Sequence, residues 1–219
     1  MTVPSRFIEV SHPIEPGMET YPGLPAPRAE VVLDYDVSRP RYQDRAEFFI
    51  ASLHLCGNTG TYVDAPVHRF RGGADLAHLP LESLADLPVI RVDTSGERGI
   101  GAAALAGLNL QGCAVLVNTG WSRHWRTPRY FEAAPFLTAG ACDALLAAGA
   151  RFVGIDSLNI DDTLDPARPA HTKLLGTGVP VCEHMANLAE VPASGGRLHA
   201  VPIAWVGGAS FPVRAYVVR

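Results

Sequence analysis

The chain has 219 residues, 47% of them hydrophobic, so it can bury a full-sized core without disulfides or structural metal ions. Its net charge of -4, without any cluster of Lys and Arg, argues against a nucleic-acid partner. No apolar run approaches the roughly 20 residues of a membrane span, and residues 1–30 do not resemble a signal peptide. The four cysteines form no CxxC pair, which is typical of a reduced, cytoplasmic protein. We therefore expect one domain over residues 1–219.

The first half of the chain reads mainly as strands joined by turns. The segment 12–27 contains five prolines, which forbid a helix and favour an extended segment on the surface or at a subunit contact. Residues 79–88 suggest a short helix or turn. We expect strands over residues 6–11 (at a sheet edge), 29–35, 46–55 and 88–95.

The second half alternates helices with strands. Its clearest element is a helix over 138–149, with Thr138 as the N-cap and Gly149 as the stop signal. Further helical stretches are expected within 99–110 and 171–175. Strands are expected over 113–120, 150–156, 179–184, 197–206 and 211–219, with Gly207 and Gly208 forming the turn between the last two. This mixed order predicts an α/β or α+β domain with mixed β-sheets and few helices.

The densest group of polar, Gly and Pro residues lies between Gly57 and Phe70. In an extended segment Asn58, Tyr62 and Asp64 point to one side, because strand side chains alternate with a period of two. His54 shares that parity, and His68 follows the strand's end. A functional site and a polar turn capped by the carboxylate are both compatible with this spacing.

Another candidate group lies around the run from His171 to His184. His171 opens a helical turn, and Glu183 ends a short strand. If both side chains converge with Asp64, they form a metal site rich in oxygen and nitrogen donors. Taken alone, these residues are better explained as a surface Glu and a helix-capping His.

Two more segments carry functional side chains. Trp121 and Trp125 alternate with arginines, a pattern that suits either an aromatic substrate pocket or a subunit interface. The acidic run 154–162 follows a strand without forming a GxSxG elbow, so Ser157 is a poor nucleophile candidate. We interpret this run as a loop that organises the site or caps its own turns.

At these residues the chain resembles the cyclase family, which includes bacterial kynurenine formamidase and isatin hydrolase. The family signature is HxGTHxDxPxH, and the corresponding window here reads NTGTYVDAPVH, residues 58–68. Five of the seven signature positions match (Gly60, Thr61, Asp64, Pro66 and His68), and Asn58 and Tyr62 replace two histidines that bind metal in the family. A later His and carboxylate, twelve positions apart in the family, match His171 and Glu183. The resemblance extends to Glu9–His12, 118–121 and the segment VGIDSLNIDD.

The resemblance implies a swivelling β/β/α-type fold and a metal-dependent hydrolase of small amides. Asp64, His171 and Glu183 would bind a divalent cation, zinc or manganese, and His68 would act as the general base. The implied reaction is the arylformamidase step of tryptophan catabolism, N-formylkynurenine to kynurenine and formate. Trp121 or Trp125 would contact the substrate's aromatic ring. Family members assemble as dimers or tetramers, and the segment 12–27 is a candidate arm toward a neighbour.

The two substitutions leave three outcomes open. Asn58 can offer an amide oxygen, and Tyr62 a phenol oxygen that must deprotonate to bind strongly. His54 and His184 are alternative replacements for the missing imidazoles. With fewer nitrogen donors the site suits manganese, magnesium or weakly held zinc. The chain is then a re-tuned formamidase, a hydrolase of another cyclic amide or lactone, or a metal-free small-molecule-binding homologue.

Overall fold

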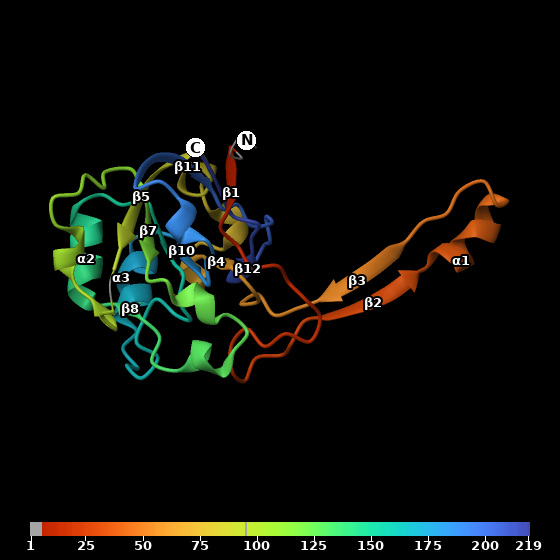
Figure 1. Cartoon of the computed structure of the whole chain (residues 1–219), viewed down its shortest axis with the longest axis horizontal. Helices are drawn as coiled ribbons and strands as arrows, with labels where there is room; N and C mark the ends of the chain where they lie inside the picture. Colours follow the sequence, from red (N-terminus) through yellow and green to blue (C-terminus); the bar gives the residue numbers. More distant parts are fainter. Residues whose placement is uncertain (1–5, 95) are drawn as a thin grey trace, which may run out of the picture.

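A nine-stranded mixed sheet runs through the body of the molecule, in a computed structural model that describes residues 6–94 and 96–219 (Figure 1). The strand order is β1-β13-β11-β5-β7-β9-β10-β4-β12. β5, β7, β9 and β10 run parallel to one another, and the strands on either side pair antiparallel. The strands are β1 (Phe7–Glu9), β4 (Tyr62–Asp64), β5 (Leu87–Asp93), β7 (Ala114–Asn118), β9 (Phe152–Ile155), β10 (Val181–Glu183), β11 (Ser194–His199), β12 (Ser210–Pro212) and β13 (Tyr216–Val218). The predicted α/β fold with mixed sheets is confirmed, with β1 at the sheet edge.

Two α-helices, α2 (Ala139–Ala147) and α3 (Pro169–Gly176), pack beside each other on one side of the sheet (Figure 1). Thr138 caps α2 by accepting a hydrogen bond from the Ala141 amide, and Gly149 has a positive φ just beyond its end. Both predicted boundaries of this helix are therefore confirmed. Among the described residues, every helix is too short or too polar to cross a membrane. Eight short 3-10 helices complete the body and arm: η1 (Arg39–Tyr42), η2 (Pro66–His68), η3 (Leu76–His78), η4 (Leu81–Ser83), η5 (Ala102–Leu105), η6 (Trp121–His124), η7 (Pro128–Phe131) and η8 (Leu188–Glu190).

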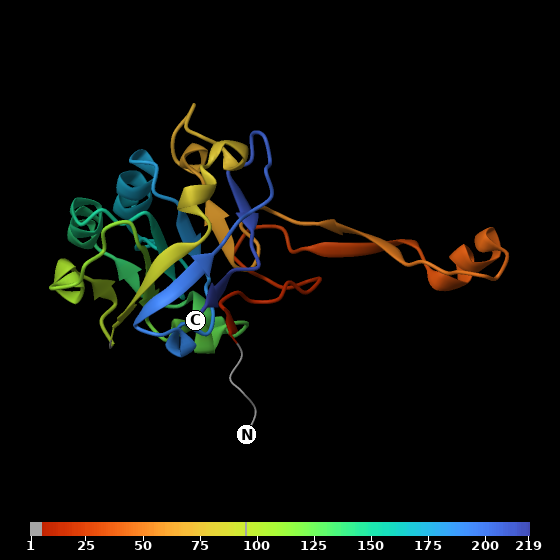
Figure 2. The same ribbon diagram turned by 90° about the horizontal axis from the view of Figure 1, so that it is seen from above.

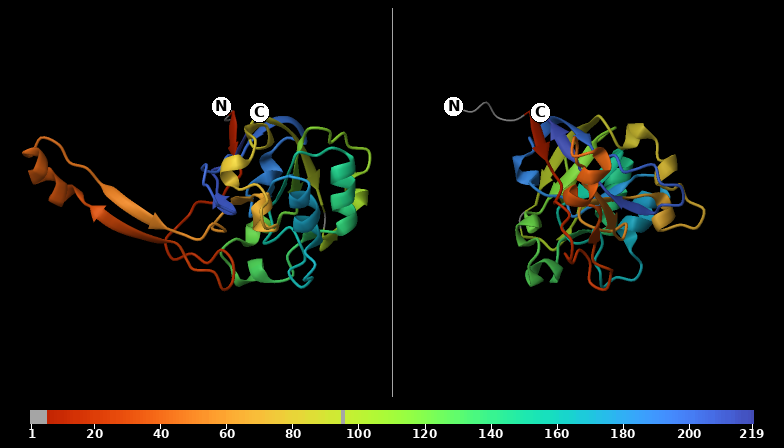
Figure 3. Two further views of the ribbon diagram at one scale, coloured as in Figure 1. Left: turned by 180° about the vertical axis from the view of Figure 1, so that it is seen from behind. Right: turned by 90° about the vertical axis from the view of Figure 1, so that its right-hand side faces the viewer.

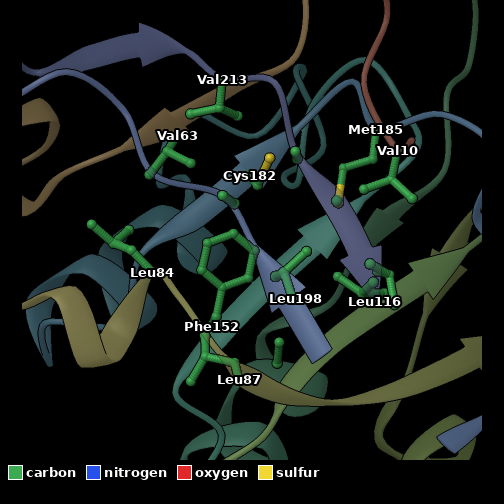
Figure 4. Close-up of a cluster of buried hydrophobic side chains, with 14 of the residues drawn as sticks. Val10, Val63, Leu84, Leu87, Leu116, Phe152, Cys182, Met185, Leu198 and Val213 are labelled. Carbon is green, nitrogen blue, oxygen red and sulfur yellow. The ribbon is translucent and has the colours of Figure 1, made fainter. Parts of the chain in front are cut away.

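The sheet is buried on both faces, which explains the unbroken apolar run of β7. Ala114 and Leu116 belong to one hydrophobic cluster, whereas Val115 and Val117 belong to the cluster under α2 and α3. Figure 4 shows part of the first cluster, where Leu116 and Phe152 lie with residues from several other strands. Each such side chain contributes about 1.5–3 kcal/mol by leaving water.

A long two-stranded hairpin projects from the body, as Figures 1, 2 and 3 show. It consists of β2 (Arg28–Leu33) and β3 (Ile50–His54), and its tip carries α1 (Tyr35–Ser38) and η1. The sequence predicts both strands, but it places the candidate arm in the preceding segment 12–27. That segment instead lies on the body, where the His12 amide donates to Thr61 Oγ1. A third, small sheet pairs β6 (Gly99–Ile100) with β8 (Phe136–Leu137).

Three elements differ from the sequence prediction because prolines and glycines interrupt them. The strand expected over 197–206 ends at His199, before Pro202, and the one expected over 211–219 is divided after Pro212. β11 pairs with β5 and β13 whereas β12 pairs with β4, so Gly207 and Gly208 do not close a hairpin. Within 99–110 the helical stretch is limited to the 3-10 turn η5, because glycines flank it on both sides, and Gly99–Ile100 forms β6.

Candidate metal centre

Strand pairing brings four polar side chains to one place in the sheet. β4 lies between β10 and β12, and its register puts Asp64 opposite Ser210 and Tyr62 opposite Glu183. Directly opposed residues share a face of the sheet, so each pair meets. The Ser210 hydroxyl donates to Asp64 Oδ1, and the Tyr62 hydroxyl donates to Glu183 Oε2. The two carboxylates thus stand diagonally across one strand pair.

His171 reaches the same place from α3. Its Nε2 lies 3.6 Å from Asp64 Oδ2 and 3.6 Å from Glu183 Oε1. Asp161 holds this ring in position, since Oδ2 lies 2.6 Å from His171 Nδ1 and also accepts the His171 backbone amide. The bond at Nδ1 directs Nε2 toward the two carboxylates. The acidic loop therefore organises the site, as the sequence suggested for this run.

His68 stands at the edge of this group. It follows β4 in the turn η2, where Pro66 ends the strand. His68 Nδ1 lies 3.2 Å from Ser210 Oγ, and one donor atom from each of His68, Asp64 and His171 lies within 4.8 Å of the others. The His68 side chain is one-third exposed, whereas those of Asp64, His171 and Glu183 are buried. His68 is thus the member of the group that can exchange protons with solvent.

Two donor atoms in the group have no hydrogen-bond partner among the described residues. They are Asp64 Oδ2 and His171 Nε2, both fully buried. Leaving a buried polar atom unsatisfied costs about 1–3 kcal/mol. A divalent cation between them would satisfy both, and a set of one imidazole nitrogen and two carboxylates is a common donor set for such ions. The residues present therefore fit a metal ion.

The two buried carboxylates at this site also favour the binding of a cation. Burial raises the pKa of Glu183 to about 7, with the positive charge of His171 opposing this shift and the negative charge of Asp64 adding to it. Burial lowers the pKa of His171, but the hydrogen bond to Asp161 and the negative charges of Glu183 and Asp64 outweigh it and raise the pKa to about 10. A proton on His171 thus supplies the positive charge that a metal ion would supply when bound.

The two residues that replace family histidines also lie here. Asn58 lines a cavity that opens onto the metal centre, and its amide nitrogen lies 3.4 Å from Ser210 Oγ. Burial, followed by the charges of Glu183 and Asp64, raises the pKa of Tyr62 well above 10, so its phenol stays neutral and bonds to Glu183. The period-two argument holds for Tyr62 and Asp64 within β4, but Asn58 arrives through a turn.

Neither alternative histidine joins the donor group. His54 lies exposed on the arm, 3.9 Å from Glu30 Oε2, so its shared parity with Asp64 does not bring it to the site. His184 is buried, with Nδ1 3.0 Å from the Tyr130 hydroxyl. It lies just beyond the end of β10 with φ 55°, and its ring packs against those of Trp125 and Tyr130.

A cavity of about 310 Å³ opens onto the metal centre. Five of the residues singled out from the sequence line it: Asn58, Tyr62, His68, His171 and Glu183. Asn159, from the run 154–162 that the sequence already singled out, also lines it. Four others were missed by sequence reasoning: Tyr21, Leu24, Arg69 and Arg168. Arg69 directly follows the motif that ends at His68, a signal that could have found it. Ser210 carries no such signal, because only the pairing of β12 with β4 brings it to Asp64.

Neither of the two tryptophans lines this cavity. Trp121 is buried and donates from Nε1 to the Tyr130 carbonyl, with the Arg129 guanidinium over its ring. Trp125 stacks on His12, with ring centroids 4.2 Å apart. Contact of either indole with a substrate stays a prediction.

Comparison with known proteins shows the family to which the chain belongs. The family model described as "Putative cyclase" matches residues 8–162. The chain belongs to the cyclase family. A kynurenine formamidase of Bacillus cereus is 28% identical over 97% of both chains, and one of Salinibacter ruber is 29% identical over 95% of both. The resemblance inferred from residues 58–68, 171 and 183 is thereby confirmed at the level of the family.

Solved structures share the fold. Isatin hydrolase A from Labrenzia aggregata, bound to benzyl benzoate, superposes with a TM-score of 0.84 at 23% identity, covering 97% of this chain and 93% of that one. A protein described as a potential metal-dependent hydrolase with cyclase activity gives a TM-score of 0.80 at 27% identity, covering 97% and 98%.

Proposed function

We propose that this chain is a metal-dependent hydrolase of small amides, and that its best-supported reaction is conversion of N-formylkynurenine to kynurenine and formate. The observation that carries the proposal is the pair of buried, unpartnered donor atoms, Asp64 Oδ2 and His171 Nε2, beside Glu183. Kynurenine formamidases that match along almost the whole chain support the choice of substrate. Glu183, Asp64 and His171 would hold the cation, and the oxygen-rich set favours manganese, magnesium or weakly held zinc.

The side chains around the cation site would have separate roles in the reaction. When bound, the cation would polarise the substrate carbonyl and make water more acidic. His68 lines the cavity with its Nδ1 beside Ser210, so its other ring nitrogen is placed to take the proton of the attacking water and pass it to the leaving amine. Tyr62 and Asp161 hold Glu183 and His171 in place through their hydrogen bonds. A cytoplasmic location and a role in tryptophan catabolism belong to the same proposal.

A second candidate is hydrolysis of a cyclic amide or lactone, and one observation favours it. Asn58 and Tyr62 line the cavity where the family carries metal-binding histidines, and the neutral Tyr62 phenol is engaged by Glu183. The altered side chains change both the donor set and the shape next to the substrate. A substrate specificity different from that of the kynurenine formamidases would follow from this change.

Elemental analysis of the purified protein, before and after incubation with divalent cations, is the first test. We expect one bound ion per site, and its loss in Asp64→Ala and His171→Ala, together with loss of N-formylkynurenine hydrolysis. A panel containing formanilides, cyclic imides and lactones, assayed with several metals, separates the two candidate reactions. Protein that takes up no metal and turns over none of these compounds would instead be a binding homologue.

A double variant, Asn58→His/Tyr62→His, gives the matched comparison. If the native residues have silenced catalysis, this variant gains turnover that the wild type lacks. If the wild type already has substantial turnover and the variant shows the same or less, the binding-protein alternative is excluded.

A further inference from the structure

Two arginines line the cavity beside the metal centre without a carboxylate partner. Among the residues that the structure describes, neither Arg69 nor Arg168 has a carboxylate oxygen within 4.0 Å, whereas several surface arginines do. Arg69 Nε donates to Thr172 Oγ1 at 3.1 Å, and Arg168 Nη1 lies 3.4 Å from Asn159 Oδ1. Both guanidiniums therefore keep donors and a full positive charge available at the cavity wall.

The chain holds Arg168 in this place at a conformational cost. It has φ 47° and ψ 59°, a left-handed backbone that a long side chain seldom adopts, immediately before the first residue of α3. Asp162 lies close in the sequence, yet its Oδ1 pairs with Arg98, and only its carbonyl oxygen approaches Arg168. Asp165 lies still closer in the sequence, and its Oδ1 accepts the Ala167 amide instead of pairing with Arg168.

The remaining wall of the cavity is partly apolar. Tyr21 and Leu24, from the proline-rich segment, line it together with the two arginines and the metal-centre residues. The cavity therefore combines three kinds of surface: the carboxylate and imidazole donors of the metal centre, the apolar side chains of Tyr21 and Leu24, and the two guanidinium groups. Carboxylate is the substrate group that guanidinium binds best, through two parallel charge-assisted hydrogen bonds.

We propose that Arg69 and Arg168 form an anion subsite, and that the substrate is an aryl amide bearing a carboxylate remote from the bond that is cleaved. This inference rests on the proposed function and deepens it, because it assigns the residues that would recognise the carboxylate of such a substrate. The guanidiniums bind the carboxylate, Tyr21 and Leu24 contact the aryl part, and the scissile carbonyl faces Asp64 and His171.

Calorimetric titration with L-kynurenine and with kynuramine, its decarboxylated counterpart, tests the subsite without catalysis. We expect the wild type to bind kynurenine about 10- to 100-fold more tightly, the loss typical of removing one charge-assisted contact. In Arg168→Gln and Arg69→Gln this preference falls toward unity. Arg71→Gln is the matched control, since Arg71 lies in the same turn but does not line the cavity. Arg168→Lys keeps the charge and should retain part of the preference.

Hydrolysis of N-formylkynurenine and of its decarboxylated analogue separates this subsite from the proposed function. Turnover of both formamides at equal KM, unaffected by the arginine variants, overturns the subsite and leaves the function standing. A carboxylate preference in binding, lost in Arg168→Gln, without hydrolysis of either formamide upholds the subsite and refutes the function. Equal or undetectable binding of both ligands by the wild type overturns the subsite.

Discussion

Replacing Asp161 by Asn isolates the contribution of ring orientation to metal binding. Asp161 Oδ1 accepts the Ala170 amide at 2.6 Å, and Oδ2 lies 2.6 Å from His171 Nδ1. Asn has a single acceptor oxygen. If that oxygen stays on the backbone amide, the Asn NH2 group faces Nδ1, which must then give up its proton. The proton moves to Nε2, the atom that faces Asp64 and Glu183, where it competes with the cation.

We expect Asp161→Asn to weaken divalent-cation affinity about 10- to 100-fold, because loss of a partner behind a ligating His has this effect in other metal sites. This corresponds to about 1.4–2.8 kcal/mol. Competition with a chromophoric chelator measures the affinity directly. Asp162→Asn is the control, since Asp162 contacts Leu164 and Arg98 and has no bond to His171.

The metal-free variants must also be compared for folding. Thermal unfolding distinguishes a reoriented ring in a folded protein from loss of the α3 N-terminus. The reasoning is refuted if folded Asp161→Asn binds the cation within twofold of the wild-type affinity, or if Asp162→Asn weakens it as much.

Three further changes test other parts of the structure. Ser210→Ala removes the hydroxyl that donates to Asp64, so we expect severalfold weaker cation affinity in the chelator assay, and unchanged affinity would contradict the role assigned to it. Burial lowers the pKa of His12 from 6.5 to about 4. The unfolded state therefore takes up a proton first, and the free energy of unfolding falls by about 3 kcal/mol as the pH falls from 6.5 toward 4. Above pH 6.5 this residue causes no such change. His12→Phe keeps the stack on Trp125 and should flatten this decline in urea unfolding at pH 7.5 and 4.5; an equally steep decline would refute the assignment. Thr138→Ala should cost about 1 kcal/mol of unfolding free energy, and no loss would show that the cap contributes nothing.

The elements that the sequence predicts well are those specified by local pattern. β7 is an unbroken apolar run, and α2 has Thr138 before it and Gly149 after it. The proximity of Asp64 and His171 could also be predicted, because both belong to motifs that resemble those of one family.

What the sequence could not supply is the non-local part of the site. The period-two argument fails before Tyr62 because the chain turns there: Gly60 has φ 65°, and a side chain at Gly57 would collide with the Ser210 carbonyl oxygen. Ser210 itself becomes part of the site only through strand pairing. Arg168 depends on an unfavourable backbone conformation that local propensity does not predict.

The pairing of β12 with β4 has a consequence for biosynthesis. The donor group includes residues from Asp64 to Glu183, but the hydroxyl that fixes Asp64 comes from Ser210, close to the C-terminus. During translation the earlier strands can assemble while Asp64 still lacks this partner. The complete group therefore forms only after β12 has left the ribosome and paired with β4, so ion uptake would report that this pairing has taken place.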